Sequence, residues 1–466
     1  MLYRFRSIDK LIGVEYEELQ KQYFYFSPPY ELNDPLEGFV DFFWKADDIA
    51  WLGLFKNYVW QLFNTLIHVR INAPLENIKK MFFSRTEIYP KDSPFFKFRF
   101  EVEKNFTNEK LISEIASILG KSNKEINSYT LKTILGMIHS IALFHANELC
   151  EQMEEKVFTR KEWLNDSAVS KKTINYQPII EIVTSLLGDT INAEKIFAFT
   201  QSIRYKLELE TTESNLDEIM EYLIIDFPDN YVKHVTNLAY SDWHTVCFNR
   251  NYKDTKMWSH YASNHEGVCL MFNFKSEDHV ALTALDENSK DKNKNLPLKP
   301  IDYDSKPSRI NFFLTLGNLW GDERQHWFFQ NDETSTTLTF MLNNEEKWRK
   351  DYWIEFEKRF LRKGHSWNSE QEVRLIINDH FYSHQSANSR KYKYDFNKLD
   401  GIIFGINTKL SDKKKIIKIV KEKCKENMRD NFCIYQARYD TINENIEKDL
   451  VLKINSNKII SNGYSQ

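Results

Sequence analysis

The hydrophobic pattern divides the chain into stretches of different character. Residues 1 to about 44 hold short apolar runs such as YFYFS, and the proline-containing stretch PPYELNDPLEG predicts an extended loop between them. From about 45 to 238 the apolar residues recur at helical spacing. After residue 238 short apolar runs return, and these predict strands that are separated by polar loops. The runs are HTVCFNR, GVCLMFNF, VRLII and DGIIFGI.

The helical pattern is clearest from residue 122 to residue 152. Ser122 and Glu125 have the spacing of a capping box, and Gly120 just before them is a typical helix stop. A second amphipathic helix is predicted near the C-terminus, in SDKKKIIKIVKEKCKENM, with Ile416 and Val420 on its inward face. The pattern therefore predicts a mixed α+β protein in which a helical insertion separates the two parts of one sheet.

Composition and charge exclude several classes of protein. The 466 residues carry 63 basic and 67 acidic side chains, a net charge of −4, which argues against a generally basic nucleic-acid coat. The five cysteines lie far apart without a C-x-x-C pair, so neither a zinc knuckle nor a disulfide framework is predicted. The N-terminus has arginines where a signal peptide is apolar, and no apolar run approaches the roughly 18 residues of a membrane helix. We expect a soluble cytoplasmic protein with no membrane partner.

Charged residues share one face of two predicted strands. In SEQEVRLII the alternation of a strand places Glu370, Glu372 and Arg374 on one side and the apolar residues on the other. In YRFRS the same alternation places Arg4 and Arg6 together. Arginine suits phosphate because its planar fork donates hydrogen bonds in pairs and keeps its charge. The alternative is an ordinary solvent-facing strand surface.

Two other polar stretches each have a structural alternative. NDPLEG contains Asn33 and Asp34 before a proline, a combination that is typical of turns. MWSHYASNHEGVCLMF contains Tyr261 between His260 and His265, and packing of its aromatic side chains is the alternative to a binding role. The two histidines are five positions apart and no H-E-x-x-H motif is present, so no metal site is predicted.

Together these stretches resemble a known family. LYRFRS, YFYFSPPYELNDPLEG, VCFNRNYKDTKMWSHYASNHEGVCLMFNF, HSWNSEQEVRLII and LDGIIFGINT occur in the order seen in the bacterial domain-of-unknown-function 2971 family. The resemblance covers roughly residues 1 to 40 and 240 to 408, and not the helical middle. That family is in turn remotely similar to ADP-ribosyltransferases, which use NAD as a substrate. This sequence departs from the transferase pattern in two respects: it has no Ser-Thr-Ser strand, and it has no histidine at the first position of the site.

The resemblance implies a fold, a domain division and a site. The fold is α+β, with an ADP-ribosyltransferase-like split β-sheet core interrupted by a large helical insertion. The expected parts are the catalytic domain in residues 1–44 and 239–440, the helical insertion in residues 45–238, and a C-terminal tail in residues 441–466. The implied catalytic residues are Glu372, Tyr261 and Glu370. The implied NAD-binding residues are Arg4, Arg6, Asn33, Asp34 and Tyr261.

The implied function is that of an NAD-dependent ADP-ribosyltransferase-like toxin or anti-phage defence effector. It would modify a nucleic acid or protein acceptor and work with an antitoxin or another defence-system partner. The lysine-rich face of residues 411–428 would then guide an anionic acceptor, or would simply be a solvated helix face.

Two other functions stay open. In a metal-dependent nuclease effector, Asp34, Glu37, Glu370 and Glu372 would collect Mg²⁺ for phosphodiester cleavage, although the acidic-strand motif with its lysine is not evident. In a non-enzymatic sensor or binding protein, the helical middle would be the recognition module.

Overall fold

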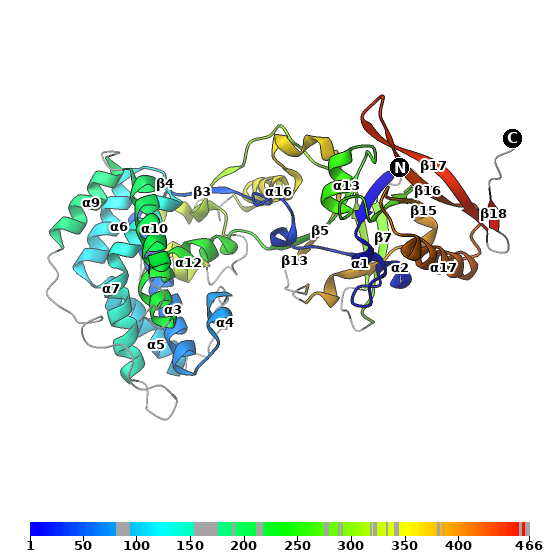
Figure 1. The fold of residues 1–466 in the computed structure, drawn as a ribbon. Coiled ribbons are helices and arrows are strands. Elements are labelled where there is room, and N and C mark those ends of the chain that lie inside the picture. The colour runs from blue at the N-terminus through cyan, green and yellow to red at the C-terminus, as the bar shows by residue number, and fades with distance from the viewer. Residues whose placement is uncertain are drawn as a thin grey trace. The chain divides into compact units, whose positions relative to one another are not determined.

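The computed structural model shows a mixed α+β protein with several sheets (Figure 1), which confirms the predicted class. It forms two compact units, which we call the sheet unit (Met1–Phe39, Asp242–Pro307 and Glu357–Gln466) and the helical unit (Val40–Ser241 and Ser308–Phe356). The structure describes residues 1–80, 94–152, 176–188, 192–210, 218–274, 279–287, 289, 292–316, 319, 324–331, 334–339, 344–379, 383–384, 386–455 and 459–461.

A nine-stranded sheet is the framework of the sheet unit, in the order β18-β17-β16-β15-β6-β1-β5-β13-β9. The N-terminal strand β1 lies antiparallel between β5 and β6, so segments far apart in the sequence meet in one sheet, as the pattern predicts. β5 also pairs antiparallel with β13. The strands are β1 (Leu2–Arg6), β5 (Asp242–Asn249), β6 (Val268–Phe272), β9 (Lys299–Pro300), β13 (Glu372–Asp379), β15 (Leu399–Phe404), β16 (Phe432–Asp440), β17 (Asn445–Ile454) and β18 (Ile459–Ser461).

A smaller sheet and a helix enclose the core on one face of this sheet. The smaller sheet has the order β2-β14-β7-β8, with strands β2 (Tyr23–Tyr25), β14 (Lys391–Lys393), β7 (His279–Ala284) and β8 (Asn293–Pro297). The helix is α17 (Leu410–Glu426), whose buried residues Ile416 and Val420 confirm the predicted amphipathic helix. Alternation along β5 sends Val246 and Phe248 into this core and leaves Cys247 on the other face of the sheet.

Short helices complete the sheet unit. Besides α17, the described α-helices that lie wholly in this unit are α1 (Ile8–Ile12), α2 (Glu18–Lys21) and α13 (Thr255–Tyr261). Its 3₁₀ helices are η1 (Pro29–Glu31), η7 (His365–Glu370), η8 (Asn388–Arg390) and η9 (Phe396–Lys398). The side chain of Asp254 caps α13 by accepting the Lys256 N–H at 2.8 Å.

The helical unit surrounds one buried helix, α3 (Asp48–Arg70), which is apolar on most sides and packs against α5, α6, α7 and η5. Its helices are α4 (Leu75–Lys80), α5 (Pro94–Thr107), α6 (Lys110–Ser122), α7 (Ser128–Gln152), α9 (Gln177–Leu187), α10 (Ala193–Glu210), α11 (Glu218–Glu221), η2 (Tyr222–Asp226), α12 (Phe227–Val235), η3 (Thr236–Leu238), η4 (Phe312–Leu314), η5 (Gln325–Phe329) and η6 (Thr337–Thr339). Its strands are β3 (Asp41–Trp44), β4 (Ile126–Asn127), β10 (Arg309–Asn311), β11 (Gln330–Asn331) and β12 (Thr334–Ser335). Helix α16 (Glu345–Leu361) continues from this unit into the sheet unit.

The two units differ from the predicted division in two places. Residues 308–356, which the sequence assigns to the second part of the catalytic domain, belong to the helical unit because β10 pairs with β3. Residues 441–466, which the sequence assigns to a tail, contain β17 and β18, and β17 pairs with β16 along its length. Pairing between distant segments, rather than local pattern, decides both assignments.

The predicted helix boundary near residue 122 is wrong. Ser122 ends α6 instead of capping the next helix, and Asn127 provides the cap of α7 by accepting the Thr130 N–H at 2.9 Å. Gly120 lies inside α6, where a Cβ atom would be 2.5 Å from the Asp48 backbone nitrogen. This glycine therefore serves a close approach between α6 and the start of α3 rather than a helix stop.

A glycine also permits close packing in the middle of α3. A Cβ atom on Gly53 would lie 1.7 Å from the Trp327 carbonyl oxygen, which is backbone and does not move aside. We expect Gly53→Ala to lower the free energy of unfolding by about 3 kcal/mol, the upper part of the usual range for overpacking. The matched control is Gly136→Ala in α7, where nothing lies within 4 Å, and where we expect a gain of roughly 0.5–1 kcal/mol. Urea unfolding followed by circular dichroism measures both, and equal stability of the two variants would contradict the packing described.

Among the helices that the structure describes, none combines the length and the apolar character that a membrane span requires.

Candidate functional site

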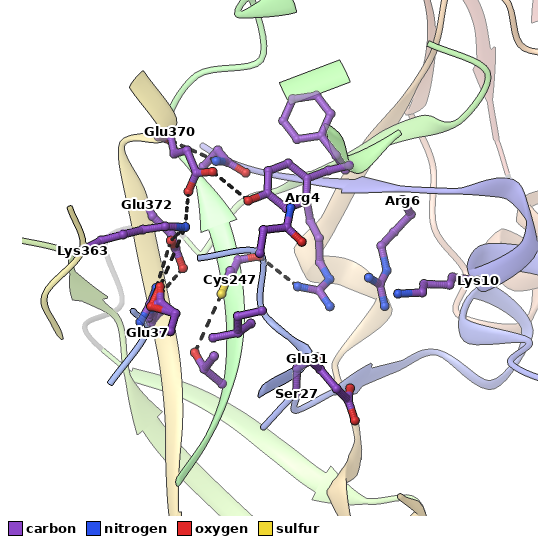
Figure 2. A pocket seen from close by; sticks show the side chains of 17 residues that line it. Arg4, Arg6, Lys10, Ser27, Glu31, Glu37, Cys247, Lys363, Glu370 and Glu372 are labelled. Atoms are coloured by element: carbon purple, nitrogen blue, oxygen red, sulfur yellow. Dashed lines mark hydrogen bonds and ion pairs between the residues drawn. The ribbon is translucent and has the colours of Figure 1, made fainter. Parts of the chain in front are cut away.

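A pocket lies at strands β1, β5 and β13 of the nine-stranded sheet. It is lined by β1, the loop after β2, β5, the end of α13 and the segment from Lys363 to Arg374 (Figure 2). All of these parts belong to the sheet unit. The empty space of the pocket is about 760 Å³ when the open solvent at its mouth is included.

Five charged side chains form one network at this pocket, and we call them the carboxylate cluster: Glu37, Lys363, Glu370, Glu372 and Arg374. Lys363 Nζ donates to Glu370 Oε2 at 2.7 Å and to Glu372 Oε2 at 3.2 Å. Arg374 Nε donates to Glu372 Oε1 at 2.6 Å, and Arg374 Nη2 donates to Glu37 Oε1 at 2.5 Å. All five residues are buried, so ion pairs rather than water compensate their charges.

The local backbone explains how Glu370 and Glu372 reach the same partner. Glu372 is the first residue of β13, as predicted, but Glu370 is the last residue of η7 and is not in the strand. Gln371 between them has φ 47°, in the left-handed region. The prediction that simple strand alternation brings the two carboxylates together is therefore wrong in its geometry, although both side chains do meet at Lys363.

The environment shifts the pKa values of Glu370 and Glu372 in opposite directions. Burial opposes ionisation of Glu372, but the charges of Arg374 and Lys363 outweigh it and lower the pKa of Glu372 to about 2. Burial raises the pKa of Glu370 above its ordinary value, and the nearby charge of Glu372 adds to this although Lys363 opposes it. Burial also raises the pKa of Glu37, against the effect of Arg374. Glu372 is thus an ionised carboxylate beside two carboxyl groups that take up a proton more readily.

Tyr261 completes this side of the pocket. Its hydroxyl donates to Glu370 Oε1 at 2.7 Å, which joins the end of α13 to the residue before β13. Burial raises the pKa of Tyr261, so the hydroxyl remains protonated and continues to act as a donor. The alternative of plain aromatic packing describes Trp258, which is fully buried, whereas Tyr261 both packs against the cluster that contains Trp258 and lines the pocket.

Cations occupy the other side of the pocket. Figure 2 shows Arg4, Arg6 and Lys10 across from Lys363 and Glu370. Arg4 Nη1 donates to the Cys247 carbonyl oxygen at 2.9 Å, and burial followed by the charge of Arg6 lowers the pKa of Arg4 to about 10.

The neighbouring cations differ in how their charges are compensated. Arg6 forms a bidentate ion pair with Glu18, with Nε to Oε2 at 2.7 Å. Burial, with the charge of Arg6 second, lowers the pKa of Lys10. This side of the pocket therefore presents positive charge that Glu18 compensates only in part.

The loop after β2 contributes Asn33 and Glu37 to the pocket but not Asp34. Asp34 Oδ1 accepts the Leu36 N–H at 2.9 Å, which is the turn contact that the sequence offered as its alternative. The structure thus brings Arg4, Arg6, Asn33, Tyr261, Glu370 and Glu372 to one pocket and leaves Asp34 at its border. The solvated-surface alternative for Glu370, Glu372 and Arg374 is wrong, because these residues are only 2, 3 and 0% exposed.

Sequence reasoning missed Lys363 entirely and did not connect Glu37 with Arg374. Lys363 lies in LRKGHSW, where nothing in the pattern distinguishes a buried lysine from a solvated one. The one available signal was the excess of carboxylates in the predicted site, since buried carboxylates require cationic partners. Cys247 was also missed as a pocket residue, and burial raises the pKa of its thiol, so it is not an activated nucleophile.

The comparisons with known proteins bear on this segment. Residues 257–375 match the family described as Protein of unknown function (DUF2971). The matched stretch is well under half of the chain, and it runs from α13 into β13, so it includes Tyr261, Lys363, Glu370 and Glu372. No curated protein and no solved structure matches the chain. The predicted resemblance to the family is therefore supported for this stretch alone.

The arrangement disfavours the magnesium alternative. Of the four acidic residues that it requires, Asp34 faces a turn and the other three surround Lys363 and Arg374. A divalent cation among these carboxylates would have to displace the Lys363 ammonium. In the described part of the chain, no group of three or more His, Cys, Asp or Glu side chains is arranged to hold a metal ion.

Proposed function

We propose that the pocket binds NAD and that the protein transfers ADP-ribose from NAD to a nucleic acid or protein acceptor. One observation carries the proposal. A single pocket has the cations Arg4 and Arg6 on one side and Tyr261 with the carboxylates Glu370 and Glu372 on the other. NAD has matching chemistry, because its pyrophosphate is anionic and its nicotinamide ring is cationic.

Glu372 is suited to the bond-breaking step. When the bond between nicotinamide and ribose breaks, its electron pair leaves with the nicotinamide and positive charge develops on the ribose, in an oxocarbenium-like transition state. An ionised carboxylate that contacts the ribose hydroxyl stabilises a charge that exists only at the barrier. The low pKa of Glu372, which Arg374 and Lys363 maintain against burial, keeps this carboxylate ionised.

Glu370 is suited to accept the proton of the acceptor. As the acceptor nucleophile bonds to the ribose carbon, its proton must leave, and a carboxylate with a raised pKa takes it up more readily than an ordinary one. Burial raises the pKa of Glu370, and Tyr261 and Lys363 fix the direction of its two oxygens. The two carboxyl groups then have separate roles because their environments move their acidities apart.

Arg4 is expected to contribute to NAD binding in the ground state. We expect Arg4→Met to raise the dissociation constant and the KM for NAD by about 10- to 100-fold, the effect of losing one hydrogen bond to a charged group, with kcat nearly unchanged because the contact is the same in the transition state. Calorimetric titration and initial rates measure these values. Arg438→Met is the control, since Arg438 is exposed and pairs with Asp449. An Arg4→Met variant that binds NAD as tightly as the parent would contradict this role.

The biological role follows from the same proposal. We infer an ADP-ribosyltransferase-like toxin or anti-phage effector that works with an antitoxin or another defence-system partner. In the order β6-β1-β5-β13, the arginine strand β1 and the glutamate strand β13 flank β5, and both strands line the proposed NAD pocket. The lysines on the solvent face of α17 supply positive charge for an anionic acceptor.

Incubation of the full chain with NAD, with nicotinamide release as the readout, tests the proposal. Cleavage of nucleic acid in the presence of Mg²⁺ without NAD would support the nuclease alternative instead. Tight NAD binding without turnover would support a non-enzymatic sensor.

A further inference from the structure

Lys363 has an unusual place for a lysine, because it lies almost wholly inside the protein at the wall of a pocket. It follows α16, and its backbone N–H donates to the Asp302 carbonyl oxygen at 3.1 Å, which fixes the start of the side chain. The ammonium group is 4.8 Å from the centre of the Trp367 ring and only 4% of the residue is exposed. A buried ammonium requires anionic partners, and Lys363 finds them in the carboxylate cluster.

The charges of the carboxylate cluster do not balance when all its members are ionised. Glu37, Glu370 and Glu372 supply three negative charges, whereas Lys363 and Arg374 supply two positive ones. A buried excess charge is costly, so the cluster holds one further proton or faces a positive charge in the pocket. Glu372 is bound by both cations, and Glu37 is bound by Arg374 through both of its oxygens.

Glu370 is the member of the cluster whose ionisation depends most directly on Lys363. Its Oε2 accepts from Lys363 and its Oε1 accepts from the neutral Tyr261 hydroxyl, so Lys363 is its only hydrogen-bonded cation among the described residues. The titratable and charged groups that act on Glu370 are Lys363, Tyr261, Glu372 and Tyr303. Beyond them, Glu37 pairs with Lys363 and Arg374 pairs with Glu372.

We propose that Lys363 is a positioning residue, whose ammonium holds Glu370 and Glu372 side by side and favours the ionised form of Glu370. This inference rests on the proposed function for its consequence in catalysis, since it concerns the two carboxylates assigned to bond breaking and proton removal. Without the ammonium, the two carboxylates would repel each other and Glu370 would retain its proton to higher pH. Lys363 acts through Glu370 and Glu372, and the arrangement requires no contact between its ammonium and the reacting atoms.

Infrared difference titration of the protein without NAD tests the inference independently of activity. The carbonyl band of a protonated carboxyl group disappears as Glu370 ionises, and Glu370→Gln identifies the band. We expect Lys363→Gln to raise the midpoint of this band by about 1 to 3 pH units, the usual effect of one nearby opposite charge. Lys253→Gln is the control, because Lys253 forms a partly exposed ion pair with Glu447, and the midpoint of the Glu370 band in this variant should equal that of the parent.

A charge-preserving variant keeps the test decisive if Lys363→Gln does not fold. Lys363→Arg retains the positive charge, so its midpoint should remain close to that of the parent. A Lys363→Gln midpoint equal to that of the parent, or a Lys363→Arg midpoint raised by more than about 1 pH unit, would overturn the inference. The acidic limb of the kcat/KM profile for NAD should move upward in pH together with the infrared midpoint in Lys363→Gln. If the parent protein does not turn over NAD, the proposed function fails, while the infrared titration still decides the role of Lys363.

Discussion

Glu372→Gln is expected to reduce the rate of NAD-dependent nicotinamide release by about 10²- to 10³-fold, which is the usual cost of losing one electrostatic contact to a transition state. Glutamine keeps the shape of the side chain but removes the negative charge that stabilises the developing oxocarbenium ion. In the parent protein Arg374 and Lys363 hold this carboxylate ionised, against the effect of burial, with a pKa of about 2. The loss should therefore persist over the whole pH range above that value.

The control for Glu372→Gln must distinguish a rate lost with the negative charge from a rate lost because the protein is less stable. Glu372 also pairs with two buried cations, so the glutamine variant should unfold at a lower temperature, and its rate is compared at a temperature where circular dichroism shows it folded. Glu447→Gln removes a carboxylate from a partly exposed pair with Lys253 in the same unit and should leave the rate unchanged. A folded Glu372→Gln protein with the parent rate would remove Glu372 from the proposed chemistry.

Arg374→Met is expected to have the largest effect on stability, a loss of about 3 to 5 kcal/mol in the free energy of unfolding, because removing one partner of a buried ion pair leaves the other charge uncompensated. Arg374 is 0% exposed and binds both Glu37 and Glu372. Urea denaturation measures the difference. Arg438→Met is the matched control, since its pair with Asp449 is more than half exposed and such pairs contribute little. Equal effects of the two substitutions would contradict the role of Arg374 in the cluster.

The Arg374→Met effect should depend on pH in a defined direction. The pKa of Glu372 falls from an ordinary 4.5 to about 2 in the folded protein, where the charges of Arg374 and Lys363 overcome burial. A lowered pKa contributes stability that is fully present above the unfolded value and is lost as pH falls through the folded value. In Arg374→Met most of this contribution is absent, so the difference from the parent should shrink between about pH 4.5 and pH 2.

Much of the site could be predicted because strand alternation is a local property. The Y-R-F-R alternation at the N-terminus and the E-V-R-L alternation near residue 372 placed Arg4 and Glu372 on charged strand faces, and the sheet brings both faces to one pocket. The α+β class was also predictable, since helical and strand periods occupy different stretches of the chain. The amphipathic pattern of α17 likewise identified its buried side, including Ile416.

The features that the sequence did not predict depend on contacts between distant segments. Lys363 has a place in the site because Glu37, Glu370 and Glu372 converge on it from two parts of the chain, and a single sequence does not show such convergence. The left-handed backbone conformation at Gln371 likewise has no sequence signal, because the residue is neither glycine nor asparagine. Gly120 resembled a helix stop, yet it is small because α6 approaches Asp48 closely. In each case tertiary packing, which local propensity does not report, decided the structure.

The most direct test of the account is nicotinamide release from NAD by the purified full chain, with and without nucleic acid or protein acceptors, measured beside Glu372→Gln and Glu447→Gln. We expect release by the parent and by Glu447→Gln, and a rate lower by about 10²- to 10³-fold in folded Glu372→Gln. Absence of release by the parent with every acceptor tested, or equal release by all three proteins, would contradict the claim that this charged pocket cleaves NAD.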